Sequence, residues 1–140
     1  MRVGEFILGY FYPEFVSILN IDRQVAGISS AGVTWWDPDE PPIAATNFNG
    51  TAWTRIDISD AVPPASAAGI LLTVKPTGGS LPPVKCAVRS SEDELLIDSF
   101  QSQINPYLLR LKDSETSIEA MLVEEDRLVE LLARGYLEFR

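Results

Sequence analysis

Apolar and polar residues alternate along much of the chain from Val33 onward, and this pattern predicts β-strands. Prolines, glycines and Asn/Asp clusters separate the strand-like segments at short intervals, which favours an antiparallel sandwich over alternating β–α units. The predicted strands are residues 32–36, 43–48, 51–59, 69–75, 84–90, 94–100 and 107–112. We therefore expect an all-β fold, an antiparallel β-sandwich of jelly-roll type with about eight strands.

The pair Asn49-Gly50 lies between two of these segments. Asn-Gly suits the two positive-φ positions of a type I′ turn, so it predicts a hairpin that joins residues 43–48 to 51–59. Alternation assigns the side chains of the second strand to two faces. Thr54, Ile56 and Ile58 share one face, and Trp53, Arg55 and Asp57 share the other, outer face.

Residues 116–134 fit two structures. Strong helix formers, a Thr116-x-x-Glu119 capping box and Gly135 as a possible C-cap favour a helix. The alternative is two strands, Ile118–Val123 and Leu128–Phe139, joined by an acidic turn. In the second of these strands the residues that share one face are Val129, Leu131, Ala133, Leu137 and Phe139. We favour the two strands, because a sandwich needs partners that close its sheets.

Residues 1–31 differ from the rest of the chain. They show neither clean alternation nor a helical stripe, and Gly4, Gly9 and Pro13 argue against one long helix. We interpret them as an extended N-terminal arm, which precedes a sandwich domain of residues 32–140 and docks on a neighbouring chain. Its aromatic anchors would be Phe6, Tyr10, Phe11, Tyr12 and Phe15. The alternative is a first strand and a loop within the same core.

Composition excludes several classes of function. The chain of 140 residues has 20 acidic and 11 basic residues and a net charge of −9, so it repels nucleic acid and anionic membranes. It has no histidine, which excludes Ser-His-Asp and Cys-His catalysis. Its single cysteine, Cys86, alternates with Val84 and Val88 and is therefore interpreted as a core residue. We expect no catalytic residue, no metal site and no cofactor.

The tryptophans are the remaining candidates for a binding surface. Trp35 and Trp36 are adjacent in a predicted strand, so one side chain points into the core and the other points outward. We assign Trp36 and Trp53 to protein interfaces, together with the aromatic residues of the arm. The alternative is stacking against a sugar, as in a carbohydrate-binding module.

The stretch "WTRIDISDAVPPASAAGILLTV", Trp53 to Val74, passes from a strand through a Pro63-Pro64 corner into an aliphatic strand. This order, and the ending "VELLARGYLEF" with Gly135-Tyr136, resemble small accessory structural proteins of tailed bacteriophages. The resemblance implies a jelly-roll β-sandwich without enzymatic activity. It further implies a capsid decoration (cement) protein on the outside of the virion, a homotrimer that binds the major capsid protein. A tail or fibre component is the alternative within the same class.

Overall fold

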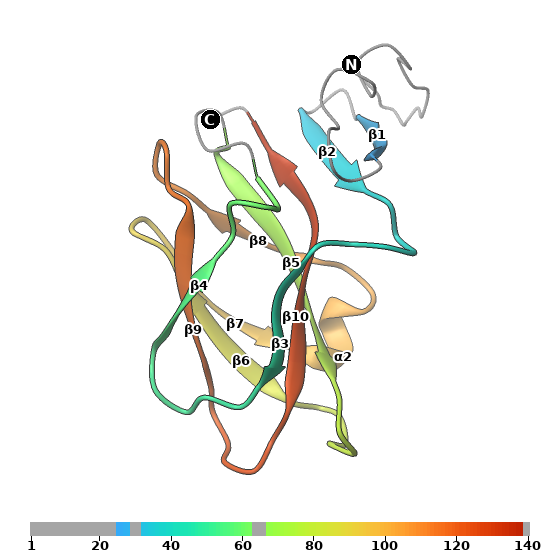
Figure 1. The fold of residues 1–140 in the computed structure, drawn as a ribbon, viewed down its shortest axis with the longest axis vertical. Coiled ribbons are helices and arrows are strands. Elements are labelled where there is room, and N and C mark those ends of the chain that lie inside the picture. Colours follow the sequence, from blue (N-terminus) through green and yellow to red (C-terminus); the bar gives the residue numbers. More distant parts are fainter. Residues whose placement is uncertain (1–24, 29–31, 63–66, 139–140) are drawn as a thin grey trace.

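The computed structural model describes residues 25–28, 32–62 and 67–138, which form two packed antiparallel β-sheets (Figure 1). The first sheet contains β1 (Val25–Ile28), β2 (Val33–Trp36), β3 (Ile43–Phe48), β5 (Gly69–Pro76), β8 (Tyr107–Arg110) and β10 (Val129–Leu137). The second contains β4 (Thr54–Asp57), β6 (Lys85–Arg89), β7 (Glu94–Asp98) and β9 (Ser117–Leu122). The predicted all-β sandwich is confirmed. The short helix α2 (Ser99–Ser102) follows β7, and no helix of the described residues is long and apolar enough to cross a membrane.

The strands are ordered so that the chain repeatedly crosses between the sheets. The first sheet runs β1-β2-β10-β5-β8, and β3 also pairs with β10, along Val129–Leu132, whereas β2 pairs with Gly135–Leu137. The second sheet runs β4-β9-β6-β7. From β3 to β10, consecutive strands lie in opposite sheets except β6 and β7, which form a hairpin. Most pairings therefore join strands far apart in the sequence.

The core lies between the two sheets, where alternate residues of each strand point inward, and in β5 the intervening Leu71 and Thr73 are buried as well. Ile70, Leu72 and Val74 of β5 are fully buried, and so is Cys86 of β6, as its position between two valines predicted. Each fully buried aliphatic side chain contributes about 1.5–3 kcal/mol relative to an exposed one. The same alternation directs the neighbouring side chains onto the two outer faces.

The C-terminal segment forms β9 and β10, so the prediction of two strands is confirmed and the helix is not formed. Sheet partners override helix propensity here, because each strand is paired on both sides. The predicted face of β10 holds as far as Ala133, which pairs with Leu72. A β-bulge then inserts one residue, and Tyr136 is buried where Leu137 was expected. Phe139 lies outside the described residues.

The hairpin predicted at Asn49-Gly50 is wrong. β3 pairs with β10 and β4 pairs with β9, so the segment between them connects the two sheets. Gly50 does not adopt a positive φ, and the left-handed residue nearby is Asn47, with φ 49°. The N–H of Leu122 donates to the Gly50 carbonyl oxygen over 2.7 Å, which fastens this crossing to β9. The pairing of β3 with β10 and of β4 with β9 therefore determines the structure here, rather than the local preference of Asn-Gly for a turn.

The predicted N-terminal arm is described only in part. Its aromatic residues Phe6, Tyr10, Phe11, Tyr12 and Phe15 lie outside the described residues, as does the Pro63-Pro64 corner. β1 falls within residues 1–31 and pairs with β2, so strand pairing begins before residue 32.

Candidate functional site

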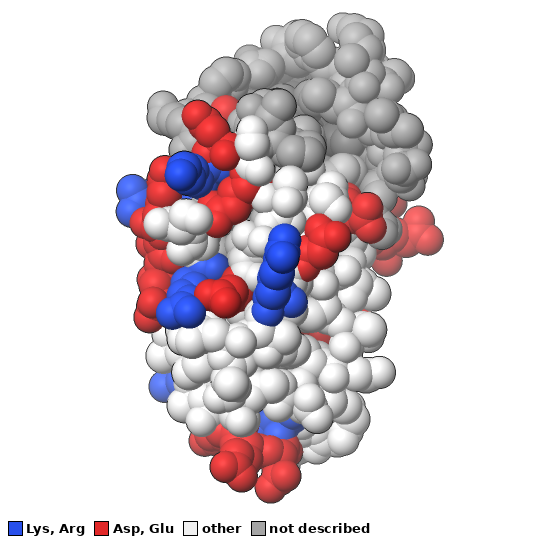
Figure 2. Space-filling model, turned by 60° about the vertical axis from the view of Figure 1, so that its left-hand side comes forward, with Lys and Arg blue, Asp and Glu red and all other residues white. Residues whose placement is uncertain are grey.

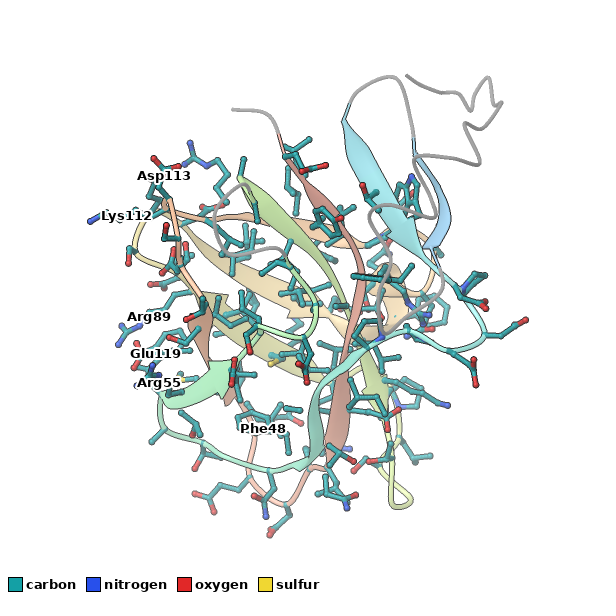
Figure 3. The ribbon with its side chains drawn as sticks, turned by 45° about the horizontal axis from the view of Figure 1, so that its top comes forward. Phe48, Arg55, Arg89, Lys112, Asp113 and Glu119 are labelled. Atoms are coloured by element: carbon teal, nitrogen blue, oxygen red, sulfur yellow. The ribbon has the colours of Figure 1, made fainter. Side chains whose placement is uncertain are left out.

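The outer face of the second sheet carries a row of alternating charges, Arg55, Glu119, Arg89 and Glu94, one from each of β4, β9, β6 and β7. We call this row the charge ladder. Arg89 Nε lies 2.7 Å from Glu119 Oε1, and Figure 3 places Arg55 beside them. The side of the molecule with β4 and β9 comes forward in Figure 2, where basic and acidic side chains are interspersed. The ladder largely neutralises its own charge.

An apolar row runs beside the charge ladder. Ala87 of β6 pairs with Met121 and with Leu96, and Trp53 precedes the residue of β4 that pairs with Ala120. Leu96 is 50% exposed, whereas Trp53 and Met121 are half-buried. The Arg89 guanidinium lies 4.1 Å from the centre of the Trp53 ring, a cation–π contact. Trp53 therefore lies on the outer face, as predicted, with one side of its ring covered by Arg89.

A pocket of about 320 Å³ opens on the outer side of the first sheet. Its walls come from β2 and the loop after it, from β5 and β10, and from α2 and the segment that follows. The lining residues are Trp35, Trp36, Pro38, Thr73, Ser102, Gln103, Pro106 and Arg134. None of the lining residues in the described part of the chain is a carboxylate.

A β-bulge in β10 lies at the wall of this pocket. Ala133 and Tyr136 are buried on either side of the bulge, so Arg134 and Gly135 both lie toward the outer face. A Cβ atom on Gly135 would collide with the carbonyl oxygen of Thr34, so only glycine lets β2 approach this closely. Trp35 pairs with Gly135 and is thereby held next to Arg134.

Two hydrogen bonds to uncharged oxygens hold Arg134. Its Nε donates to Thr73 Oγ1 over 3.1 Å, and its Nη1 donates to the Pro38 carbonyl oxygen over 3.4 Å. Gln103 Nε2 donates to the Val74 carbonyl oxygen over 3.0 Å, and the exposed amide oxygen of Gln103 has no donor among the described residues. The pocket thus offers both a fixed cation and a free acceptor.

The two adjacent tryptophans lie on opposite faces, as predicted, but Trp36 is the inner one. It is 8% exposed, its Nε1 donates to the Ala61 carbonyl oxygen over 3.0 Å, and its ring centre lies 5.8 Å from that of Tyr136. Trp36 is therefore a core residue rather than the interface residue expected from the sequence. The half-buried Trp35 faces outward instead. The pairing of β2 with β10 decides which of the two tryptophans points inward. Alternation within the sequence of β2 does not reveal this pairing.

Gln103 and Arg134 were not among the residues singled out from the sequence, and Trp35 was considered beside Trp36 but was not assigned to an interface. One signal pointed toward them, since an isolated glycine in a strand pattern indicates a bulge or a close backbone approach. Gly135, directly after Arg134, is such a glycine. Gln103 carried no comparable signal, because it follows a four-residue helix that the pattern did not predict.

The cysteine and the carboxylates offer little reactive chemistry. Burial raises the pKa of the Cys86 thiol from its ordinary value of 9.0 to about 12, so the nucleophilic thiolate is scarce at neutral pH. Within residues 25–28, 32–62 and 67–138, no cluster of three or more His, Cys, Asp or Glu is placed to hold a metal ion.

Comparisons of this chain with protein-family models, with curated proteins and with solved structures found no match. Its function therefore has to be inferred from its own residues.

Proposed function

We propose that this chain is a non-enzymatic virion structural protein, a capsid decoration protein that binds the outside of a bacteriophage shell. The observation that carries the proposal is the strand order, β3-β10-β5-β8 facing β4-β9-β6-β7. We take eight strands that cross between two sheets in this order as support for a jelly roll, an architecture typical of viral capsid and lectin domains. In this proposal β1 and β2 extend the first sheet beyond the eight strands.

The outer face of the second sheet is the proposed contact with the major capsid protein. The apolar row supplies surface that a partner can bury. Burial stabilises the complex by about 25 cal/mol per Å², before the entropic cost of ordering the two partners is subtracted. The charge ladder beside it would set the register of docking, since a mismatched partner would bring like charges together. Trp53 is the proposed aromatic anchor, because Arg89 already holds its ring in place.

Self-association as a homotrimer, with the aromatic arm docked on a neighbouring subunit, belongs to the same proposal. Light scattering on the purified full-length chain measures the assembly directly. A monomer at micromolar concentration would contradict the trimer and leave the capsid contact to be tested separately.

The decisive test is where and how often the chain occurs in purified particles of the virus that encodes it. Antibody labelling and copy counting by mass spectrometry should find many copies spread over the head. Copies confined to the tail would favour a tail or fibre component, and absence from particles would overturn the proposal.

The proposed contact face is tested by binding of variants to particles that lack the protein. Leu96→Glu puts a charge into the apolar row and should abolish co-sedimentation with the particles. Leu81→Glu is the matched control, because Leu81 is 73% exposed in a loop outside the sheets. Equal binding of both variants would exclude this face.

A further inference from the structure

We propose that the pocket between β2, β10 and α2 binds an acidic saccharide, a single sugar unit that carries a carboxylate. The inference goes beyond a role in the virion and does not depend on it. It rests on three features of the pocket: an unneutralised cation, an aromatic wall and a free hydrogen-bond acceptor.

The cation is Arg134. Three basic side chains of the described residues are half-buried, and two of them have a carboxylate partner: Arg89 pairs with Glu119 and Arg127 with Glu124. Arg134 has only the neutral oxygens of Thr73 and Pro38, in a chain with a net charge of −9. A half-buried charge without a counter-ion is costly, so an anionic ligand would be favoured here.

The geometry of Arg134 suits a carboxylate. A guanidinium has five N–H donors, and Thr73 and Pro38 engage donors on Nε and Nη1. These two bonds fix the plane of the group in advance and leave donors on Nη1 and Nη2 free. Two parallel donors are what a carboxylate accepts best, and pre-organisation lowers the entropic cost of binding.

The aromatic wall is Trp35, with the rings of Pro38 and Pro106 also lining the pocket. An indole offers a flat apolar surface against which the C–H face of a sugar ring can stack. A volume of about 320 Å³ is at the small end for ligand pockets, which suits one sugar unit rather than a large cofactor.

The polar rim fits sugar hydroxyls. The free amide oxygen of Gln103 can accept from one hydroxyl, and Gln103 is fixed by its bond to the Val74 carbonyl oxygen. The wall beneath it is also fixed, since the Val74 N–H donates to Ser102 Oγ over 3.1 Å. A simple carboxylate would use Arg134 alone, and a neutral sugar would use Trp35 and Gln103. An acidic saccharide uses all three.

The test is a titration of the full-length protein with D-glucuronate and with N-acetylneuraminate, followed by tryptophan fluorescence and calorimetry. D-glucose and acetate are the matched probes that lack the carboxylate or the ring. At least one acidic sugar should bind with a Kd on the order of 1 mM, and both control probes should bind roughly tenfold more weakly.

Variants assign the binding to this pocket. Arg134→Met should lower affinity for the acidic sugar roughly tenfold, to the level of glucose. Arg89→Met is the matched control on the opposite face and should bind as the wild type does. Gln103→Ala, at an exposed position, provides a second variant should Arg134→Met fold poorly, and it should weaken both sugars alike. Equal affinity for glucuronate and glucose, no binding of either acid, or full affinity in Arg134→Met would overturn the proposal.

Discussion

Arg89 and Arg134 lie on opposite outer faces of the sandwich, each associated with a tryptophan. Arg89 stacks over Trp53 at 4.1 Å and is neutralised by Glu119 at 2.7 Å. Arg134 lines a pocket together with Trp35, and its hydrogen-bond partners are two uncharged oxygens, Thr73 Oγ1 and the Pro38 carbonyl oxygen. Both pairs consist of an arginine and a tryptophan, but the charge of Arg89 is neutralised by a carboxylate and the charge of Arg134 is not.

This difference separates a contact surface from a ligand site. Where Arg89 covers the Trp53 ring, the face is largely neutral and suits a broad partner, and the pocket of about 330 Å³ that opens beside Arg89 contains the carboxylate of Glu119. Where Arg134 leaves the Trp35 wall open, the outcome is a concavity with unused donors. The candidate site is therefore identified by interactions that the fold leaves unmade, and composition alone would not distinguish the two pairs.

The largest expected loss of stability comes from a substitution at Gly135, where the backbones of β10 and β2 approach each other at the wall of the pocket. Gly135→Ala places a Cβ against the Thr34 carbonyl oxygen. Because this oxygen belongs to the backbone of β2, the collision can be relieved only if β2 moves away from β10. We expect a loss of about 2–3 kcal/mol in the free energy of unfolding, measured with urea. Because Trp35 moves with β2, binding of acidic sugars should also weaken.

Gly50→Ala is the control for that prediction. Its Cβ would meet Thr54 Oγ1 and the Phe48 ring, which are side chains that can shift. The expected loss is smaller, about 1 kcal/mol. Equal losses at the two glycines would mean that the close approach of β2 to β10 is not what holds the pocket together.

The fold was predictable where alternation is regular. Residues 69–75 and 84–90 are rich in aliphatic residues at every second position, and both form strands whose inward residues are buried. At residues 116–134 local propensity favoured a helix, and the need for closing strands, together with the resemblance of the C-terminal ending, argued for the structure that forms. Asn49-Gly50 failed because a turn signal describes a local preference, whereas the pairing of β3 with β10 is decided by residues far along the chain.

The site was less predictable than the fold. Alternation placed Trp53 on the outer face correctly, but it could not decide between Trp35 and Trp36. Alternation from Ala133 already directs Arg134 outward, whereas the bulge that turns Gly135 outward and Tyr136 inward depends on the register of β10 against β5. Gln103 is brought into the pocket by a bond to Val74, a contact across 29 positions in the sequence.

The next largest loss of stability is expected for Cys86→Ser, which should affect the two outer faces equally. Cys86 lies in the core between them, and Cys86→Ser buries a hydroxyl in place of a thiol, at a cost of about 1–2 kcal/mol. Sugar binding and the Trp53 contact should both persist in the folded variant. A variant that lost only one of them would show that the two faces are not supported by a common core.

The raised pKa of Cys86 adds a pH dependence. Burial favours the neutral thiol in the folded state, whose pKa is about 12 compared with the ordinary 9.0. The unfolded chain therefore loses its proton first, and stability should fall as pH rises from about 9 toward 12. Cys86→Ala should remove this part of the decline, and rapid thiol labelling of the native protein at pH 8 would contradict the buried thiol.

Replacing each arginine by methionine compares the two pairs directly. Arg89→Met removes a cation–π contact and a salt bridge and should cost about 1 kcal/mol in the free energy of unfolding. Arg134→Met removes two hydrogen bonds to neutral oxygens but also removes an unneutralised charge, so its cost should be smaller, about 0.5 kcal/mol. Salt should reduce the loss at Arg89 more than the loss at Arg134. A larger loss of stability in Arg134→Met than in Arg89→Met would indicate that Arg134 mainly stabilises the fold.

The smallest expected effect on stability comes from Glu119→Gln, which makes Arg89 resemble Arg134 by removing its carboxylate. The Arg89 and Glu119 side chains are 38% and 42% exposed, so solvent screens the pair and the loss should be about 0.5 kcal/mol or less. The variant should not gain glucuronate binding, because Arg89 still covers the Trp53 ring and no open aromatic wall is created. Calorimetry with glucuronate checks this. If the variant bound glucuronate as tightly as the wild-type pocket does, an unpaired arginine would be sufficient, and the walls formed by Trp35 and Gln103 would not be needed to explain recognition.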